Sequence, residues 1–200
     1  MMRHLLFQLP LLLASTALAA ACPVAKDLGD GIRLTQTPAY TAVFRRDPSG
    51  AVIESESAEG GGSYNYVMYN GLLETAFFEL DPSQKAPRGR DRFHYSFALE
   101  DVFPLKPWTG QTGIQTHYDA DWTLIAQSNF GYRVLSADQL EIGDCTYDRL
   151  AVETYIVGAD GARMVTFGYL PDLGLSVLMG YQESDGSRTT FEPVSIAAIE

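Results

Sequence analysis

The chain has 200 residues, and its 25 acidic against 14 basic side chains give a formal net charge of −11. A charge of this sign excludes binding to nucleic acid or to an anionic membrane surface through a general electrostatic field. The sequence contains no phosphate-binding loop and no nucleophile-elbow motif, so we expect no cofactor and identify no catalytic residue.

Residues 1–21 have the pattern of a secretory signal peptide. Arg3 and His4 form a short basic start, residues 5–18 are mostly apolar, and small residues follow up to Ala21. Removal of this leader leaves residues 22–200, a length typical of a single domain. No other uncharged apolar run approaches the ~20 residues of a transmembrane helix, so we expect a periplasmic or secreted protein without a transmembrane segment.

The two cysteines, Cys22 and Cys145, are expected to form a disulfide. An exported chain meets an oxidising compartment, in which a pair of cysteines is usually oxidised. A lipoprotein is the alternative, with Cys22 acylated and Cys145 free. The small residues before Cys22 suit a lipid-attachment site, but the position three places before it, where a large aliphatic residue is usual, is Ala19.

The first half of the exported chain alternates strand-like runs with turn residues. Strands are predicted over residues 32–36, 40–47, 64–69 and 72–80. Between the first and second pair, residues 51–59 alternate two acids, Glu54 and Glu56, with small residues. Asn70-Gly71 between two alternating runs is the strongest short-range signal of a β-hairpin.

The middle of the chain carries many aromatic side chains. Phe93, Tyr95 and Phe97 alternate with smaller residues, which predicts a strand with one aromatic face. Two prolines in the segment 102–110 exclude a central strand there. The bulky residues of this segment are expected to close one end of a barrel: Phe103, Leu105 and Trp108. Three further strands are expected over residues 113–118, 122–128 and 131–136, and a short helix over residues 138–145.

The C-terminal part predicts an antiparallel meander. Runs with one bulky apolar face occupy residues 150–157, 164–169 and 175–182. Turn signals recur about every 12 residues, at 159–161, 171–174 and 184–186. We therefore predict an all-β domain, a single antiparallel sheet of about ten strands that is curved into a barrel or half-barrel, with little helix.

Three short motifs in residues 93–192 resemble those of a family of exported proteobacterial β-proteins. They are Phe-Pro-Leu at 103–105, Gly-Asp-Cys at 143–145 and Tyr-Leu-Pro-Asp-Leu-Gly-Leu at 169–175. Such proteins loosely resemble the curved antiparallel half-barrels of periplasmic lipoprotein carriers, which hold an acyl chain. The resemblance implies a binding fold and brings no catalytic residues with it.

The surplus of aromatic side chains on strand faces favours a non-enzymatic protein that binds an apolar small molecule, a lipid or another envelope component within the curved sheet. The candidate lining residues are Tyr64, Tyr66, Phe93, Tyr95, Phe97, Phe103, Trp108 and Tyr169, and Phe167 is a further part of the aromatic surplus.

Two other functions stay open. An interaction or structural module of the cell envelope needs no pocket, and it predicts an exposed apolar patch that would contact another envelope protein. A hydrolase or metal-dependent enzyme would depend on His94 and His117. In an extended strand, His117 would share one face with Asp119 and Asp121, and these are types of side chain that bind metals. Asp-Ala-Asp between apolar runs is, however, also typical of a hairpin turn.

Overall fold

The structure, a computed structural model, describes residues 21–57, 62–80, 88–159 and 161–199. The predicted leader lies outside the described residues except for Ala21. Regular structure in the described ranges is almost entirely β-strand, with two short 3-10 helices, η1 (Ala25–Leu28) and η3 (Leu99–Asp101). Among the residues described, no helix has the length and apolar character that crossing a bilayer requires.

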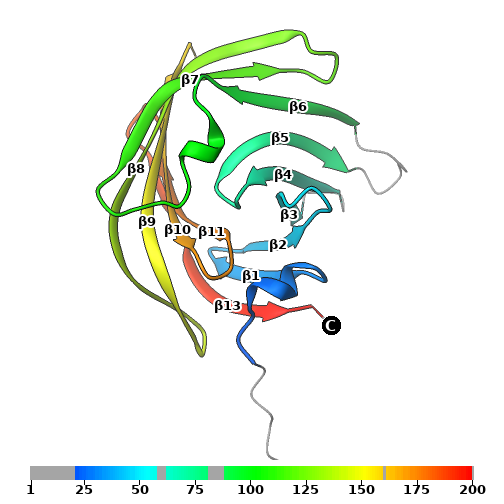
Figure 1. The fold of residues 1–200 in the computed structure, drawn as a ribbon, viewed down its shortest axis with the longest axis vertical. Coiled ribbons are helices and arrows are strands. Elements are labelled where there is room, and N and C mark those ends of the chain that lie inside the picture. The colour runs from blue at the N-terminus through cyan, green and yellow to red at the C-terminus, as the bar shows by residue number, and fades with distance from the viewer. Residues whose placement is uncertain (1–20, 58–61, 81–87, 160, 200) are drawn as a thin grey trace, which may run out of the picture.

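Thirteen strands form one antiparallel sheet that rolls up on itself (Figure 1). In chain order they are β1 (Ile32–Thr37), β2 (Tyr40–Arg46), β3 (Val52–Ser57), β4 (Ser63–Tyr69), β5 (Leu73–Leu80), β6 (Arg88–Tyr95), β7 (Gly110–Tyr118), β8 (Leu124–Ile142), β9 (Cys145–Gly158), β10 (Gly161–Leu170), β11 (Leu175–Gln182), β12 (Arg188–Thr190) and β13 (Glu192–Ala198). Each strand from β1 to β11 pairs with the next, and β13 returns to pair with β1.

The sheet is nearly closed into a barrel, because its two edge strands are consecutive in the chain. Only Phe191 separates β12, at one edge, from β13, at the other. The backbone N–H of Phe191 donates to the carbonyl of Met179 in β11. From β1, the strand next to the other edge, Nε2 of Gln36 donates to the carbonyl of Leu178 at 2.7 Å. These two bonds link the two ends of the sheet.

Alternating burial along the strands explains why these residues form a sheet. In β1, the alternate residues Ile32, Leu34 and Gln36 are buried. Arg33, between the first two, and Thr37, after the last, are exposed. Successive side chains of a strand point to opposite faces, so a period of two places one apolar row inside. At the barrel's long hairpin the same rule holds over much of β8 and β9.

Two apolar clusters form the core. The first joins β1 to β4 with the far ends of β8 and β9 and with the β10–β11 turn; its fully buried members include Phe44, Leu34, Ile142, Leu170 and Leu175. The second joins β8, β9 and the loop before β7, and includes Val102, Leu105, Phe130, Val134 and Val152. The two clusters adjoin in β10, where Tyr169 of the second cluster precedes Leu170 of the first.

The predicted all-β antiparallel fold is confirmed, with thirteen strands where about ten were expected. Predicted strands 122–128 and 131–136 are one strand, β8, whose register shifts between Val134 and Ser136. The predicted helix over residues 138–145 is wrong. The chain stays extended to Ile142 and reverses at Gly143, which has a φ of +60° and so suits a tight turn.

The predicted disulfide between Cys22 and Cys145 is confirmed, with 5.6 Å between the two Cα atoms. It ties the start of the described chain to the β8–β9 turn. Beside it, the hydroxyl of Tyr147 donates to the carbonyl of Pro23 at 3.1 Å. The bond uses the sulfur atom that lipid attachment to Cys22 would need, and a disulfide suggests an oxidising, extracytoplasmic setting.

The Asn70-Gly71 turn supports a prediction about stability. Gly71 has a φ of +68°, and a Cβ there would overlap the carbonyl oxygen of Gly174 in the β10–β11 turn. We expect Gly71→Ala to lower the free energy of unfolding by about 2–3 kcal/mol. The strain of an alanine at positive φ and the overlap of its Cβ with the carbonyl oxygen of Gly174 both contribute to this loss. Gly50→Ala is the matched control, since Gly50 has a φ of +92° but nothing within 4 Å of an added Cβ.

Urea denaturation of both glycine variants measures the two contributions separately. Gly50→Ala should cost only the conformational strain, about 1 kcal/mol. Equal losses in the two variants would show that the contact between the β4–β5 and β10–β11 turns contributes nothing.

Candidate ligand-binding site

A cavity of about 370 Å³ opens between two walls of the barrel. Strands β2 to β5 form one wall, β10 and β11 form the other, and Phe191 lies where the edges of the sheet meet. Its aromatic lining consists of Tyr40, Tyr66, Phe167, Tyr181 and Phe191. Its aliphatic and thioether lining consists of Met68, Leu72, Val165 and Leu178. A volume of this size suits one small molecule.

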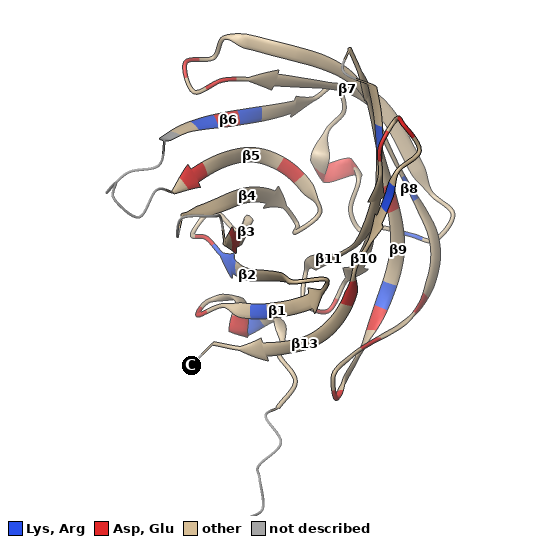
Figure 2. Cartoon of the chain, turned by 180° about the vertical axis from the view of Figure 1, so that it is seen from behind, with Lys and Arg blue, Asp and Glu red and all other residues tan. Residues whose placement is uncertain are grey.

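Three glutamates also line this cavity: Glu54, Glu56 and Glu74. Figure 2 marks acidic positions on both β3 and β5, the strands that carry them. Glu54 and Glu56 share a face of β3 with the buried Val52, so the period of two places them inside. Glu54 is only 9% exposed.

Strand register brings the polar lining together. Glu54 pairs with Phe44 of β2 on one side and with Tyr66 of β4 on the other. Glu74 enters the same face of the sheet where the β4–β5 register shifts between Val67 and Met68. The shift is a β-bulge, which redirects side chains locally.

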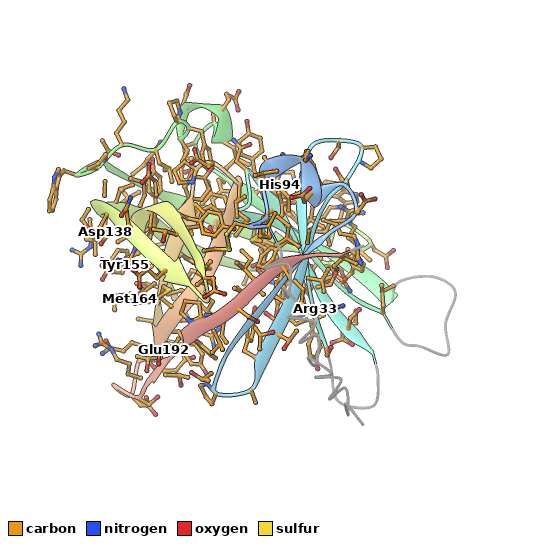
Figure 3. All side chains as sticks on the ribbon, turned by 90° about the horizontal axis from the view of Figure 1, so that it is seen from below. Arg33, His94, Asp138, Tyr155, Met164 and Glu192 are labelled. Atoms are coloured by element: carbon orange, nitrogen blue, oxygen red, sulfur yellow. A yellow bond between two sulfur atoms is a disulfide. The ribbon has the colours of Figure 1, made fainter. Side chains whose placement is uncertain are left out.

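The opposite wall follows the same alternation. Val165 of β10 lines the cavity, while its neighbour Met164 lies beside its ladder partner Tyr155 of β9. Figure 3 shows Met164 and Tyr155 at the periphery of the molecule. The face of β10 that carries Val165 and Phe167 is therefore the one that meets the glutamates across the cavity.

One hydroxyl group links two of the carboxyls. The phenol oxygen of Tyr40 lies 2.5 Å from Oε1 of Glu54 and 2.6 Å from Oε1 of Glu56. A phenol has one proton, so it can donate to only one of the two carboxyls. A proton on either carboxyl would let that carboxyl donate to the phenol oxygen in turn, so this arrangement favours a protonated glutamate.

The pKa values of the three glutamates also favour their protonated forms. Burial raises the pKa of Glu54 to about 8, and the hydrogen bond from Tyr40 opposes the shift in part. Burial also raises the pKa of Glu74 to about 8, with further contributions from Asp91 and Glu56. The pKa of Glu56 is raised as well, again chiefly by burial. With pKa values near 8, Glu54 and Glu74 hold protons at neutral pH that exposed glutamates would release.

Within the described ranges, no basic side chain forms an ion pair with any of the three glutamates. Arg163 lines the cavity, but its guanidinium lies 2.6 Å from Oε1 of Glu183 and stacks over the Tyr181 ring. The cavity therefore combines aromatic walls with carboxyls that have no cationic partner.

The predicted lining residues lie in several places. Tyr66 and Phe167 line the cavity, and the rings of Tyr66 and Phe77 lie 5.3 Å apart. Tyr64 is on the same face of β4 but is 37% exposed. Phe93, Tyr95 and Phe97 border a separate, more open depression along β6, and Tyr95 donates to the backbone carbonyl of Glu74 at 2.8 Å.

The remaining candidates lie away from the cavity. Tyr169 is buried in the second core cluster, and Phe103 packs between Tyr169 and Tyr69 at centroid distances of 5.9 and 5.8 Å. Leu105 is also buried in this cluster. Trp108 is 81% exposed and is not among the residues that line the cavity. The segment 102–110 thus closes the second core cluster with Phe103 and Leu105.

The residues of the metal hypothesis do not converge. Asp119 occupies the β7–β8 turn, where its Oδ1 accepts from the backbone N–H groups of Asp121 and Thr123. His117 contacts Asp91 instead, with 3.0 Å between Nε2 and Oδ2. His94 is exposed on the other face of β6, beside Tyr118 and Trp122. In the described part of the chain no three His, Cys, Asp or Glu side chains are grouped to hold a metal ion.

Exposed apolar side chains bear on the interaction-module alternative. Several lie around the β7–β8 turn and on the neighbouring strands: Ile114, Trp122, Leu124, Ile125 and Val157. Arg92 covers part of this surface, since its guanidinium lies 4.6 Å from the centroid of a Trp122 ring. Nothing in the structure shows what contacts these side chains.

Sequence reasoning missed the acidic part of the cavity. Tyr40, Glu54 and Glu56 were visible in alternating runs, but an acidic residue in such a run is usually exposed. The signal was the shared period of Val52, Glu54 and Glu56, which places both acids on the face of a buried valine. Reading it required knowing that residues 52–57 form a central strand.

Comparison with known proteins finds no match to a family model, a curated protein or a solved structure. The resemblance to exported proteobacterial β-proteins therefore stays an expectation drawn from three short motifs.

Proposed function

We propose that this chain is an extracytoplasmic binding protein that takes one small, largely apolar molecule into the cavity between β2–β5 and β10–β11. The observation that carries the proposal is the cavity itself, about 370 Å³ between two walls of the nearly closed barrel. Pockets for small molecules are concave, mostly apolar and supplied with a few polar groups, and this lining has that composition.

The proposed setting is the periplasm or the cell exterior. The leader-like residues 1–21 motivate export, and the Cys22–Cys145 disulfide is compatible with an oxidising compartment. In this proposal the protein binds and releases its ligand without chemical change, and the ligand is free or is delivered by another envelope component.

A pair of matched substitutions tests occupancy of the cavity. Val165 lines the cavity, so Val165→Phe should fill part of it and reduce the amount of co-purifying small molecule at least tenfold. Val194, on β13, is 48% exposed, so Val194→Phe makes the same change outside the cavity and should leave binding unchanged. Native mass spectrometry of protein purified from an exporting host measures the bound fraction.

Two results would contradict the proposal. One is wild-type protein that carries no bound molecule and acquires none from an extract of the host envelope. The other is equal loss of ligand in the two phenylalanine variants, because the effect would then not come from the cavity. Thermal unfolding of both variants verifies that each is folded.

A further inference from the structure

We infer that the ligand of this cavity is an organic cation, a molecule whose apolar body carries an amine or quaternary ammonium group that lies between the three glutamates and the aromatic rings. The inference rests on the proposed function and specifies its ligand class. A binding protein for a purely apolar molecule has no need of three glutamates in its lining.

The positions of the carboxyls carry the first step. Glu54 is nine-tenths buried, and only its Oε1 has a hydrogen-bond partner in the described residues, the hydroxyl of Tyr40. Its second oxygen is free to accept. The carboxyl of Glu74 forms no hydrogen bond or ion pair with a described side chain, although Glu74 lines the same cavity. Both carboxyls therefore have acceptor oxygens that a hydrogen-bond donor on a ligand in the cavity would occupy.

The aromatic rings carry the second step. Tyr66 and Tyr40 lie on the acidic wall, and Phe167, Tyr181 and Phe191 complete the lining. The faces of aromatic rings attract cations, and the attraction grows when the cation is desolvated. A cation in the cavity would be attracted both by the faces of the aromatic rings and by the carboxyl groups. Once ionised, the same carboxyls would repel an anionic ligand, and the described residues supply no grouping suited to a bare metal ion.

Binding of a cation would displace protons. The titratable groups that face Glu54 are Tyr40 on β2, Glu56 on β3, Tyr66 on β4, Glu74 on β5, and Arg163 and Tyr181 across the cavity. Arg163 is neutralised by Glu183, and Asp91 beside Glu74 is paired with His117. The carboxyls therefore determine the charge that a ligand meets in the cavity. A bound cation would hold them ionised at a pH where they are otherwise protonated.

The test compares choline with its neutral isostere, in which a carbon atom replaces the nitrogen, by NMR titration of the full-length exported protein. A quaternary ammonium has no titrating proton, so any pH dependence belongs to the protein. We expect choline to bind at least tenfold more tightly than the isostere at about pH 9. Its affinity should fall as pH is lowered to about 6, by up to tenfold per pH unit for each proton displaced.

Matched variants locate the effect. Glu54→Gln keeps a hydrogen-bond partner for Tyr40 but removes a carboxyl, so it should reduce both the preference for choline and its pH dependence. Glu192→Gln removes an exposed carboxyl on β13 and should change neither. Chemical-shift changes should appear at the cavity residues, for example Val165 and Leu178.

Each other outcome is decisive. Equal affinity for choline and its isostere would overturn the inference while leaving the proposed binding function intact. Choline binding that is independent of pH and of Glu54→Gln would also overturn it, because the charge would then be recognised elsewhere. If neither probe binds, the inference is overturned, and the native mass measurement alone decides the proposed function.

Discussion

We expect the Cys22→Ser variant to unfold with a free energy about 2–5 kcal/mol below that of the wild type. The disulfide joins residues separated by 123 positions, and closing so long a loop restricts the unfolded chain strongly. The chain-entropy model gives about 5 kcal/mol for a loop of this size, and measured losses are usually smaller. Few single changes remove more stability from a domain of this length.

Part of the loss should come from the folded state. The disulfide holds the N-terminal segment against the β8–β9 turn, where Tyr147 donates to Pro23 and η1 buries Leu28 completely. Without the bond this segment can detach and expose Leu28 and its neighbours in the first core cluster. Hydrogen exchange should therefore rise first in residues 22–31.

Three controls separate the disulfide from the lost side chain. Cys145→Ser and the double variant should both match Cys22→Ser, because each removes the same bond. Reductant should lower the stability of the wild type by a similar amount and leave the variants unchanged. Urea denaturation measures each value. A lipid on Cys22 would instead leave Cys145→Ser close to wild type, and this result would contradict the disulfide.

Local sequence patterns were sufficient for the main turns and for most of the strands. Asn70-Gly71 marks a hairpin because both residues tolerate positive φ, and the structure gives them φ values of +47° and +68°. Asp185-Gly186 marks another, where Oδ1 of Asp185 accepts from the N–H of Ser187. The predicted turn at 159–161 includes Asp160, which lies outside the described residues. Each of these signals spans only a few residues, so no distant part of the chain is needed to read it.

The closure of the barrel and the composition of the cavity depend on distant contacts. Gln36 reaches Leu178, which is 142 residues away, and no local pattern announces that bond. Likewise, the sequence shows which strands carry an aromatic face, but it does not indicate which of these faces lines a cavity. Phe103 and Tyr169 fill the core, whereas Phe167, two residues from Tyr169, lines the cavity. Phe167 and Tyr169 share one face of β10, so only their positions along the strand separate the cavity from the core.

The glutamates of the cavity lead to a second large prediction, that the free energy of unfolding falls as pH rises from about 5 to about 8. Burial raises the pKa of Glu54 to about 8, far above that of a glutamate in an unfolded chain. Between these two pKa values the folded state binds more protons than the unfolded state, so stability decreases with increasing pH. The stabilisation is fully present below the pKa that Glu54 has in the unfolded chain. It is lost as the pH rises through the pKa that Glu54 has in the folded protein.

The slope can reach roughly 1.4 kcal/mol per pH unit for each such carboxyl. Glu74 has a pKa raised to about 8 as well, so it adds to the same window. This behaviour differs from that of most acidic proteins, whose paired carboxylates make them less stable as pH falls. The ion pairs Arg149–Asp138 and Arg133–Glu153 oppose it only weakly, because both lie at the surface.

Glu54→Gln isolates the contribution of one carboxyl. An amide cannot ionise, so the variant should lose stability less steeply with pH and should become more stable than the wild type at about pH 8. Glu192→Gln, which also removes one negative charge but at an exposed position, should keep the wild-type slope. Urea denaturation at intervals of one pH unit gives all three curves. A wild-type stability that is constant or rises over this range would show that Glu54 ionises freely, and the cavity would then be open to water at its acidic wall.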